Sequence, residues 1–232
     1  MTMPTTTLAY VTPDGDEVEF TARVNTHDIE MIREIWGDRY YTCDGWDVPH
    51  GATVLDLGGG IGGFAVFAAV AGARCVYTFE PTPDTFDLLA ANVEPWPGTI
   101  IATEAAVTVE AGTVRMSGFE AMPDGAINTG LPAVSDEGIE VRAVSIHDVL
   151  AREPLWDVLK VDIEGHEYPL FEAMTADEWD RIETVTMEFH HDDEATCRTR
   201  GRDLGVLLMQ RGFNRVDVDW AWGCQGRLRA RH

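Results

Sequence analysis

The residues best suited to chemistry begin at Asp56, a single carboxylate inside the apolar segment Thr53–Leu57. That segment has the composition of a buried strand, and Gly58–Gly63 follow it as a turn that few side chains could enter. Phe64–Val70 is apolar and rich in alanine, which predicts a helix packed on the sheet. A strand, a glycine turn and a helix in this order begin a nucleotide-binding βαβ unit. Its glycines let the backbone approach a ligand, and its helix N-terminus offers free N–H groups.

Asp56 discriminates between two possible ligands of this turn. Gly58, Gly60 and Gly63 satisfy G-x-G-x-x-G, so a nicotinamide or flavin dinucleotide is one candidate. A buried carboxylate two residues before the first glycine would repel a pyrophosphate and attract ammonium and sulfonium charge. S-adenosylmethionine (SAM) carries both charges, and the strand end resembles D-x-G-x-G-x-G, the first motif of class I methyltransferases. We therefore predict SAM as the cofactor, against the alternative of a tight turn that binds nothing.

Two later turns complete the predicted cofactor site. Glu80 ends a second predicted strand and lies 24 residues after Asp56, where this fold presents a carboxylate to ribose hydroxyls. The turn at 104–107 is expected to flank the adenine. The predicted cofactor-binding residues are Asp56, Gly58, Gly60, Gly62, Phe64, Glu80, Pro81, Glu104, Ala106 and Asp162.

Two further strand ends should border a methyl acceptor, because ligands of an open parallel sheet bind beyond the carboxyl ends of its strands. They are Asp162–His166 and Glu188–Asp193, each of which follows a mostly apolar segment. Methyl transfer from a sulfonium is an in-line displacement that depends on alignment, and an alcohol must also lose its proton to a positioned base. The predicted catalytic residues are His190, His166, Glu188 and Asp162, and the predicted substrate-binding residues are Glu164, His191 and Tyr41.

A divalent ion is the alternative organiser of these strand ends. Carboxylates and imidazoles suit Mg²⁺, Mn²⁺ or Zn²⁺. The residues that could bind it are Asp162, Glu188, His190, His191, Asp192 and Asp193. Adjacent residues of an acidic loop rarely converge on one ion, so a metal is possible but not favoured. Lys160, the only lysine, is expected to pack its stem inside a strand and reach a carboxylate with its ammonium group.

Taken together, these segments resemble the FkbM-type methyltransferase family. The resemblance covers residues 50–190, and the K-V-D-I-E-G stretch at 160–165 is its most specific part. The matching segments are Val54–Phe64, Tyr77–Pro81 with Asn92-Val93, Ala106-Val107, Leu159–Gly165 and Met187–His190. The resemblance implies a seven-stranded Rossmann-like sheet and SAM-dependent methylation, commonly of a hydroxyl on a sugar or natural product. Gly60 stands where the family often has Asn, which removes one possible ligand hydrogen bond.

The surrounding pattern fits one α/β domain with a small addition. We predict a Rossmann-like class I methyltransferase fold at 51–232, with a mostly parallel seven-stranded sheet and helices on both faces. Residues 1–50 are predicted to form an N-terminal cap. In the cap we expect a hairpin of strands at 7–11 and 17–24, and a helix at Asp28–Trp36 capped by Asn25-Thr26.

Three more segments complete the expected topology. Residues 107–116 predict a second hairpin, turning at 110–112. Residues 117–138 are rich in Gly, Pro, Asp and Ser without periodicity, which is typical of a functional or a disordered segment, and we expect a lid over the acceptor side, with disorder as the alternative. Residues 213–219 and 225–230 predict a closing antiparallel pair.

The charge limits the possible partners. The chain has 40 acidic residues against 17 Lys plus Arg, a net charge of −23, which repels phosphate backbones. We therefore expect no nucleic-acid substrate. This composition suits a high-salt cytoplasm and equally a GC-rich genome. No apolar run reaches the ~20 residues of a membrane span, and the N-terminus lacks the pattern of a signal peptide, so no membrane partner and a cytoplasmic location are expected. A homodimer is possible.

The sequence therefore predicts a SAM-dependent methyltransferase that acts on a hydroxyl of a small metabolite, glycoside or natural product. An N-methyltransferase is the alternative on the same fold, although no N/D-P-P-Y motif follows the predicted fourth strand. An NAD(P)-dependent oxidoreductase and a catalytically silent SAM-binding scaffold are the alternatives from other classes.

Overall fold

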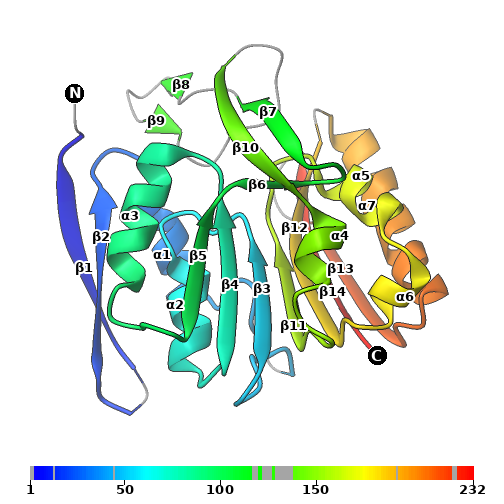
Figure 1. Ribbon diagram of the computed structural model, residues 1–232, viewed down its shortest axis with the longest axis horizontal. Helices are drawn as coiled ribbons and strands as arrows, with labels where there is room; N and C mark the ends of the chain where they lie inside the picture. The colour runs from blue at the N-terminus through cyan, green and yellow to red at the C-terminus, as the bar shows by residue number, and fades with distance from the viewer. Residues whose placement is uncertain are drawn as a thin grey trace.

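The protein is seen in a computed structural model that describes residues 3–12, 14–43, 45–116, 120–121, 127–128, 138–191, 193–220 and 224–232. Its centre is a sheet with the spatial order β13 (Arg215–Trp220), β14 (Gln225–Arg231), β12 (Thr184–His190), β11 (Val158–Val161), β3 (Thr53–Leu57), β4 (Cys75–Glu80) and β5 (Ile100–Glu104). The five strands from β12 to β5 are parallel, and β14 runs antiparallel to both of its neighbours (Figure 1). The predicted seven-stranded sheet and closing antiparallel pair are confirmed. The order reverses between β3 and β11, which is where ligands of such sheets bind.

Helices cover both faces of this sheet. One face carries α1 (Asp28–Trp36), α2 (Gly63–Val70) and α3 (Pro83–Val93), and the other carries α4 (Ile146–Leu150), α5 (Glu167–Ala173), α6 (Ala176–Trp179) and α7 (Glu194–Gln210). Successive side chains of a strand point to opposite faces, so Val54 joins the buried cluster under α1–α3 while Leu55 and Leu57 join the cluster under α4–α7. None of the helices in the described ranges is long and apolar enough to cross a membrane.

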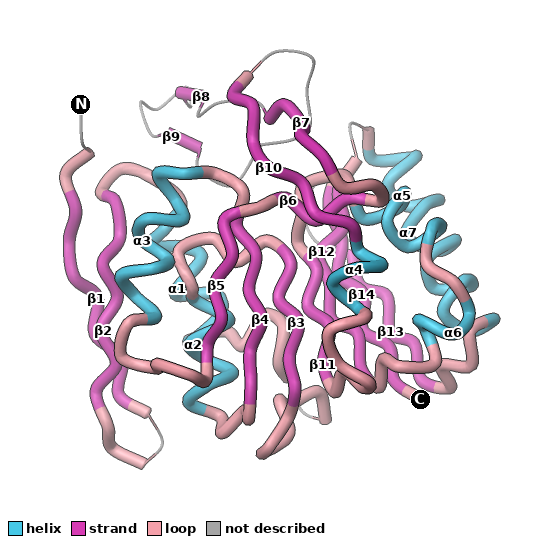
Figure 2. The backbone as a smooth tube through the Cα atoms, viewed as in Figure 1, coloured by secondary structure: helices cyan, strands magenta, loops and turns pink. Residues whose placement is uncertain are grey.

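The N-terminal hairpin of β1 (Thr5–Val11) and β2 (Glu17–Arg23) lies at the left edge of Figure 2, beside α3. Asn92 of α3 bonds to the main chain of Thr21 in both directions, at 2.8 and 3.0 Å. The hairpin and α1 are confirmed, although the residue at the α1 N-cap is His27 and not the expected Asn25-Thr26 pair. Phe20 of the hairpin shares one buried cluster with α2, so this segment and the sheet are built on a common core.

A three-stranded sheet lies at the carboxyl end of β5. It consists of β6 (Ala106–Thr108), β10 (Ile139–Ser145) and β7 (Gly112–Met116), in that spatial order. The predicted hairpin at 107–116 is therefore wrong, because β10 lies between the two short strands, parallel to β6 and antiparallel to β7. The predicted lid at 117–138 falls almost entirely outside the described residues, which include only β8 (Glu120–Ala121), β9 (Ile127–Asn128) and Gly138 of it.

Candidate active site

A cleft with two adjoining arms lies beyond the carboxyl ends of the central strands. The apolar arm is lined by Phe79, Glu80, Pro81, Ala105, Ala106, Val107, Thr108, Met116, Ile163 and His166. The ionic arm is lined by α1 side chains, Tyr40, Tyr41, Phe64, Lys160, Glu188, His190 and Gln225. Both arms share Met31, Gly58, Gly60, Asp162 and Glu164. The cleft is therefore continuous across the glycine turn.

Two glycines of the turn are required by its shape. Gly58 has φ +80°, and a Cβ added there would lie 1.7 Å from the carbonyl oxygen of Asp162, so no other residue fits. Gly60 has φ +53°, and the nearest atom to an added Cβ is Met31 Cε at 3.6 Å. The backbone at Gly60 is thus bare where both arms meet, which lets a ligand lie directly on it.

Glu80 is the buried carboxylate of the apolar arm. Its Oε2 accepts the N–H of Gly60 at 3.0 Å, and its Oε1 accepts the N–H of Thr82 at 2.9 Å. Burial raises the pKa of Glu80 to about 7, although these two N–H donors act to lower it. Each oxygen keeps acceptor capacity for a further donor such as a ribose hydroxyl.

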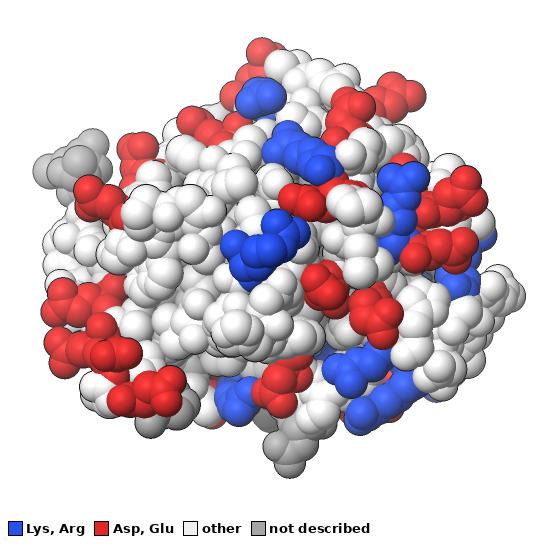
Figure 3. Space-filling model, turned by 60° about the horizontal axis from the view of Figure 1, so that its bottom comes forward, with Lys and Arg blue, Asp and Glu red and all other residues white. Residues whose placement is uncertain are grey.

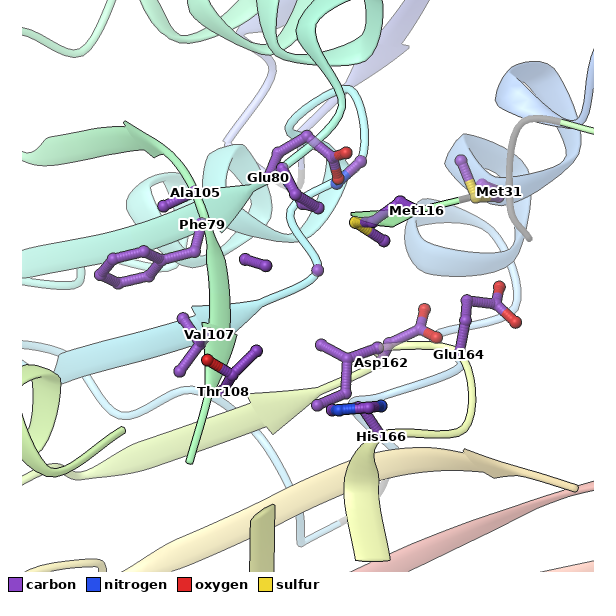
Figure 4. Close-up of a pocket in the computed structure, with 15 residues that line it drawn as sticks. Met31, Phe79, Glu80, Ala105, Val107, Thr108, Met116, Asp162, Glu164 and His166 are labelled. Atoms are coloured by element: carbon purple, nitrogen blue, oxygen red, sulfur yellow. The ribbon is translucent and has the colours of Figure 1, made fainter. Parts of the chain in front are cut away.

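The rest of the apolar arm suits a flat aromatic base. Figure 4 shows Phe79, Ala105 and Val107 on one side of the arm, with Glu80 near the glycine turn. The empty volume is about 720 Å³ including the open mouth. An apolar wall, a buried carboxylate and a bare glycine turn fit the adenine, ribose and methionine parts of SAM.

Asp56 lies beneath the glycine turn and lines neither arm. It is fully buried, accepts a hydrogen bond from Thr78 Oγ1 at 2.8 Å, and lies 3.2 Å from Lys160 Nζ. The ammonium of Lys160 also donates to the carbonyl oxygen of Gly58 at 2.6 Å. Burial acts to lower the pKa of Lys160, but the charges of Asp56 and Asp162 outweigh it and raise that pKa. Lys160 thus reaches a carboxylate as predicted, whereas the predicted direct attraction of the cofactor by Asp56 has to be corrected: its charge is already paired.

This ion pair belongs to a buried polar row that crosses the sheet on the α1–α3 face. In register from β4 to β14 the row is Thr78, Asp56, Lys160, Thr186 and Arg229. Each member is at most 6% exposed. Thr186 Oγ1 donates to the carbonyl oxygen of Tyr41 at 3.0 Å, and Arg229 Nη2 donates to that of Tyr40 at 3.2 Å. The row therefore holds the glycine turn on one side and the main chain of residues 40–41 on the other.

The ionic arm gathers carboxylates around one imidazole. His190 Nε2 lies 3.7 Å from Glu188 Oε1 and 3.7 Å from Glu164 Oε2. Its Nδ1 lies 3.2 Å from Oε1 of Glu167, a side chain with no exposed surface. Tyr41 Oη donates to Asp162 Oδ2 at 2.7 Å. These groups come from the end of β12, the loop after β11, the start of α5 and the segment before β3, and their side chains converge.

Their proximity sets their protonation. Burial acts to lower the pKa of His190, but the bond to Glu167 and the charges of Glu164 and Asp162 raise it to about 10. Burial and the charge of Asp162 raise the pKa of Glu188 to about 7. At neutral pH the imidazole is therefore charged, and Glu188 is the group poised to exchange a proton.

Asp162, Glu188 and His190 also offer one ligand atom each, all within 4.8 Å of one another, which could hold a divalent ion. A charged imidazole has no lone pair for a metal, so an ion would first have to displace its proton. Asp193, which the sequence placed in the same possible set, instead caps α7 by accepting the N–H of Thr196 at 2.9 Å. Asp192 lies outside the described residues.

The family model described as the methyltransferase FkbM domain matches residues 56–214. The chain belongs to the FkbM methyltransferase family. It is 31% identical over 237 residues to 31-O-demethyl-FK506 methyltransferase FkbM of Streptomyces tacrolimicus, covering 85% of this chain and 89% of the relative. It is 33% identical over 138 residues to hexuronic acid methyltransferase AglP of Haloferax volcanii, covering 58% of this chain and 54% of that relative. Among solved structures, magnesium protoporphyrin IX methyltransferase of Synechocystis with bound SAH matches at 14% identity, covering 88% of this chain and 82% of that chain with a TM-score of 0.48.

As a member of the FkbM family the protein is a SAM-dependent methyltransferase, and the oxidoreductase and silent-scaffold alternatives are set aside. The structure brings most of the residues predicted for this activity into the cleft. Those that line it are Gly58, Gly60, Phe64, Glu80, Pro81, Ala106, Tyr41, Asp162, Glu164, His166, Glu188 and His190.

Three other predicted residues of this FkbM-family protein lie elsewhere. Glu104 ends β5 and so belongs to the strand and not to the predicted turn at 104–107, and it lines a separate hollow with Glu140 and Arg142. Gly62 is the N-cap of α2, and an added Cβ would face α3. His191 follows β12 with its ring against Tyr168, on the side opposite to His190.

Sequence reasoning missed four residues that complete the ionic arm. Tyr40 Oη and Gln225 Nε2 donate to Glu188 Oε1 at 3.0 and 2.7 Å. Glu167 binds His190, and Glu34 of α1 lines the same arm. The positions of Glu188 and His190 at a strand end were the only local signal, since the partners come from distant segments. Tyr40 and Gln225 lie outside the segment that the family model matches.

Proposed function

We propose that the protein methylates a hydroxyl oxygen of a small, uncharged hydroxylated molecule such as a glycoside. The observation that carries the proposal is Glu188, a carboxylate with a pKa of about 7 that lines the ionic arm next to the glycine turn. An alcohol that attacks a methyl group has to lose its proton, and a base is most effective when its pKa is near the working pH. The name of the relative 31-O-demethyl-FK506 methyltransferase supports oxygen as the accepting atom.

We assign SAM to the apolar arm and the glycine turn, and the acceptor to the ionic arm. SAM, when bound, supplies an electrophilic methyl group on a sulfonium sulfur. We assign its adenosyl part to Phe79, Glu80 and the turn at 105–107, and its methionine part to the bare backbone at Gly60. The acceptor lies in the ionic arm, where the cleft fixes its oxygen in line with the methyl group.

Glu188 is assigned to accept the hydroxyl proton of the acceptor, whose oxygen would take the methyl group that SAM supplies, with the sulfur leaving as a neutral thioether. This proposal moves the role of base from His190, which the sequence favoured, to Glu188. His190 stays charged between Glu167 and Glu164 and is assigned to donate a hydrogen bond to the acceptor. Asp162, fixed by Tyr41, is assigned to bind the acceptor or the methionine part of SAM. No metal takes part in this scheme.

The charge of the ionic arm limits the acceptor class. Four acidic side chains line it, from Glu34, Asp162, Glu164 and Glu188, and one of its two cations, Lys160, is committed to Asp56. Burial raises the pKa of Glu164 to about 9, so the repulsion of a carboxylated or phosphorylated acceptor comes from Asp162 and the ionised form of Glu188. This distinguishes the proposed acceptor from the hexuronic acid in the name of the relative AglP. Figure 3 shows acidic residues spread over the visible face with arginines interspersed, which does not suit a nucleic-acid backbone either.

The proposal is tested by incubating the protein with methyl-labelled SAM and fractions of an extract of its own organism, then determining which atom of the product carries the label. We expect a methyl ether on a neutral product. Label on nitrogen would support the N-methyltransferase alternative, and label on a carboxylated or phosphorylated product would refute the assigned acceptor class.

A further inference from the structure

The segment Tyr40-Tyr41 crosses the carboxyl ends of β11 and β12 and touches two carboxylates of the ionic arm, Glu188 and Asp162. Tyr40 Oη donates to Glu188 Oε1 at 3.0 Å, and Tyr41 Oη donates to Asp162 Oδ2 at 2.7 Å. These contacts join residues that are 148 and 121 positions apart in the chain. Neighbouring side chains of one short segment thus each hold a carboxylate from a different strand end.

The main chain of the segment is itself fixed by the sheet. Thr186 and Arg229, two members of the buried polar row, donate to the carbonyl oxygens of Tyr41 and Tyr40. The ring of Tyr40 lies edge-on to that of Tyr41, with centroids 5.1 Å apart, and the guanidinium of Arg227 covers the Tyr40 ring at 4.6 Å. A phenol held by its main chain and by both sides of its ring has little freedom to turn away from Glu188.

A second donor, from β14, reaches the same oxygen. Gln225 begins β14, in register with His190 of β12, and its Nε2 donates to Glu188 Oε1 at 2.7 Å. The hydrogen bonds that the Glu188 side chain makes with described residues are all accepted by Oε1. Oε2 is therefore the oxygen left to accept a proton from a ligand in the arm.

We propose that Tyr40 and Gln225 are positioning residues, which fix Glu188 through Oε1 and leave Oε2 to meet the acceptor hydroxyl. This inference rests on the proposed function, in which Glu188 is the base. Both residues lie outside the matched segment 56–214, so the acceptor side is completed by parts of the chain that the family model does not include. Tyr40 does not compete as a base, because burial and the adjacent Glu188 hold the pKa of its phenol far above the ordinary value.

The phenol of Tyr40 should favour the charged form of Glu188, because a donor stabilises a carboxylate more than a carboxylic acid. Other charged groups also face this carboxylate. They are Glu34 of α1, Lys160 of β11, Asp162 and Glu164 beyond β11, His190 of β12 and, opposite Glu188 in register, Arg227 of β14. All of them are retained in a Tyr40→Phe variant, so the change isolates one hydrogen bond.

The test is a ¹³C NMR titration of the Glu188 side-chain carboxyl in the full chain, assigned with Glu188→Gln. In Tyr40→Phe we expect its pKa to rise by about one pH unit, the effect of one hydrogen bond to a charged group. Tyr168→Phe is the matched control, because the Tyr168 hydroxyl is buried and has no hydrogen-bond partner among the described residues. It should leave the titration of Glu188 unchanged. Gln225→Leu removes the other donor and keeps the test decisive if Tyr40→Phe does not fold.

Methyl transfer supplies the second readout. At pH 7 a rise of one unit lowers the ionised fraction of Glu188, and hence the rate of Tyr40→Phe, by about fivefold, and the rate should recover at pH 9 with SAM affinity unchanged. A rate loss that is equal at every pH, or an unshifted titration in both variants, would overturn the positioning role. A shifted titration in an enzyme that methylates nitrogen would instead leave the positioning intact and refute the proposed O-methylation.

Discussion

The buried ion pair under the glycine turn allows a quantitative prediction for Lys160→Met. The variant keeps the stem that packs within β11 and removes the ammonium, which lies 3.2 Å from Asp56 Oδ1 and 2.6 Å from the Gly58 carbonyl oxygen. Asp56 then stays fully buried with Thr78 as its remaining donor. Breaking a buried pair by removing one partner costs about 3–5 kcal/mol, because it leaves an uncompensated charge.

For a chain of this length each kcal/mol lowers the melting temperature by about 2–4 °C, so we expect a loss of about 6–20 °C. Thermal and urea unfolding followed by circular dichroism at pH 7 provide the assay. The double variant Asp56→Asn with Lys160→Met removes both charges and should be more stable than Lys160→Met alone. Glu172→Gln is the control, since it opens an exposed pair with Arg200 and should change stability by less than about 1 kcal/mol.

The reasoning would be refuted if the free energy of unfolding of Lys160→Met lay within about 1 kcal/mol of the wild-type value, which is the loss expected for an exposed pair. It would also fail if the double variant were less stable than the single one, because the pair would then not be the source of the loss. The same variant should bind SAM more weakly, since the carbonyl of Gly58 loses the donor that fixes the turn.

Three further predictions concern the cofactor, a metal and the surface charge. The folded-state pKa of Glu80 is raised to about 7, so its carboxylate forms as pH rises through 7, and SAM affinity measured by calorimetry should increase about tenfold from pH 6 to pH 8. Glu80→Gln should remove that increase. If the variant kept the same dependence of affinity on pH, the titrating group would be a residue other than Glu80. EDTA should leave methyl transfer unchanged, because the cluster keeps His190 charged; loss of activity that Mn²⁺ restores would show that Asp162, Glu188 and His190 bind an ion instead. With a net charge of −23, the melting temperature should rise between 0.1 M and 1 M KCl, as the Debye length falls from ~10 Å to ~3 Å; a flat response would mean that the acidic residues are already compensated.

Local patterns were sufficient to predict most of the elements. The bounds of α1 and α3 follow from apolar periodicity and from Pro83 at the first position of α3, and the seven strands follow from apolar runs between turns. Ligands bind at the carboxyl ends of parallel strands, and this rule alone predicts that Asp162, Glu188 and His190 lie in one cleft, where the structure has them.

Partners that come from distant parts of the chain could not be predicted. β6 and β7 both pair with β10, which lies about thirty residues further along the chain, and no local pattern in 107–116 indicates that pairing. The burial of Asp56 was predicted, but its pairing with Lys160 depends on the register of two strands that are joined through about half of the chain. The roles of Tyr40 and Gln225 likewise depend on where the two ends of the chain cross the sheet.

The most direct test of the central claim is a single-turnover measurement of methyl transfer from ¹³C-methyl SAM to a neutral hydroxylated acceptor, in the wild type and in Glu188→Gln. The wild type should form a methyl ether at a rate that rises with pH through about 7. Glu188→Gln should form it roughly 10²–10⁴-fold more slowly, with SAM affinity nearly unchanged, because only the proton acceptor is lost. An undiminished rate in Glu188→Gln, or a methyl group found on nitrogen, would contradict the account.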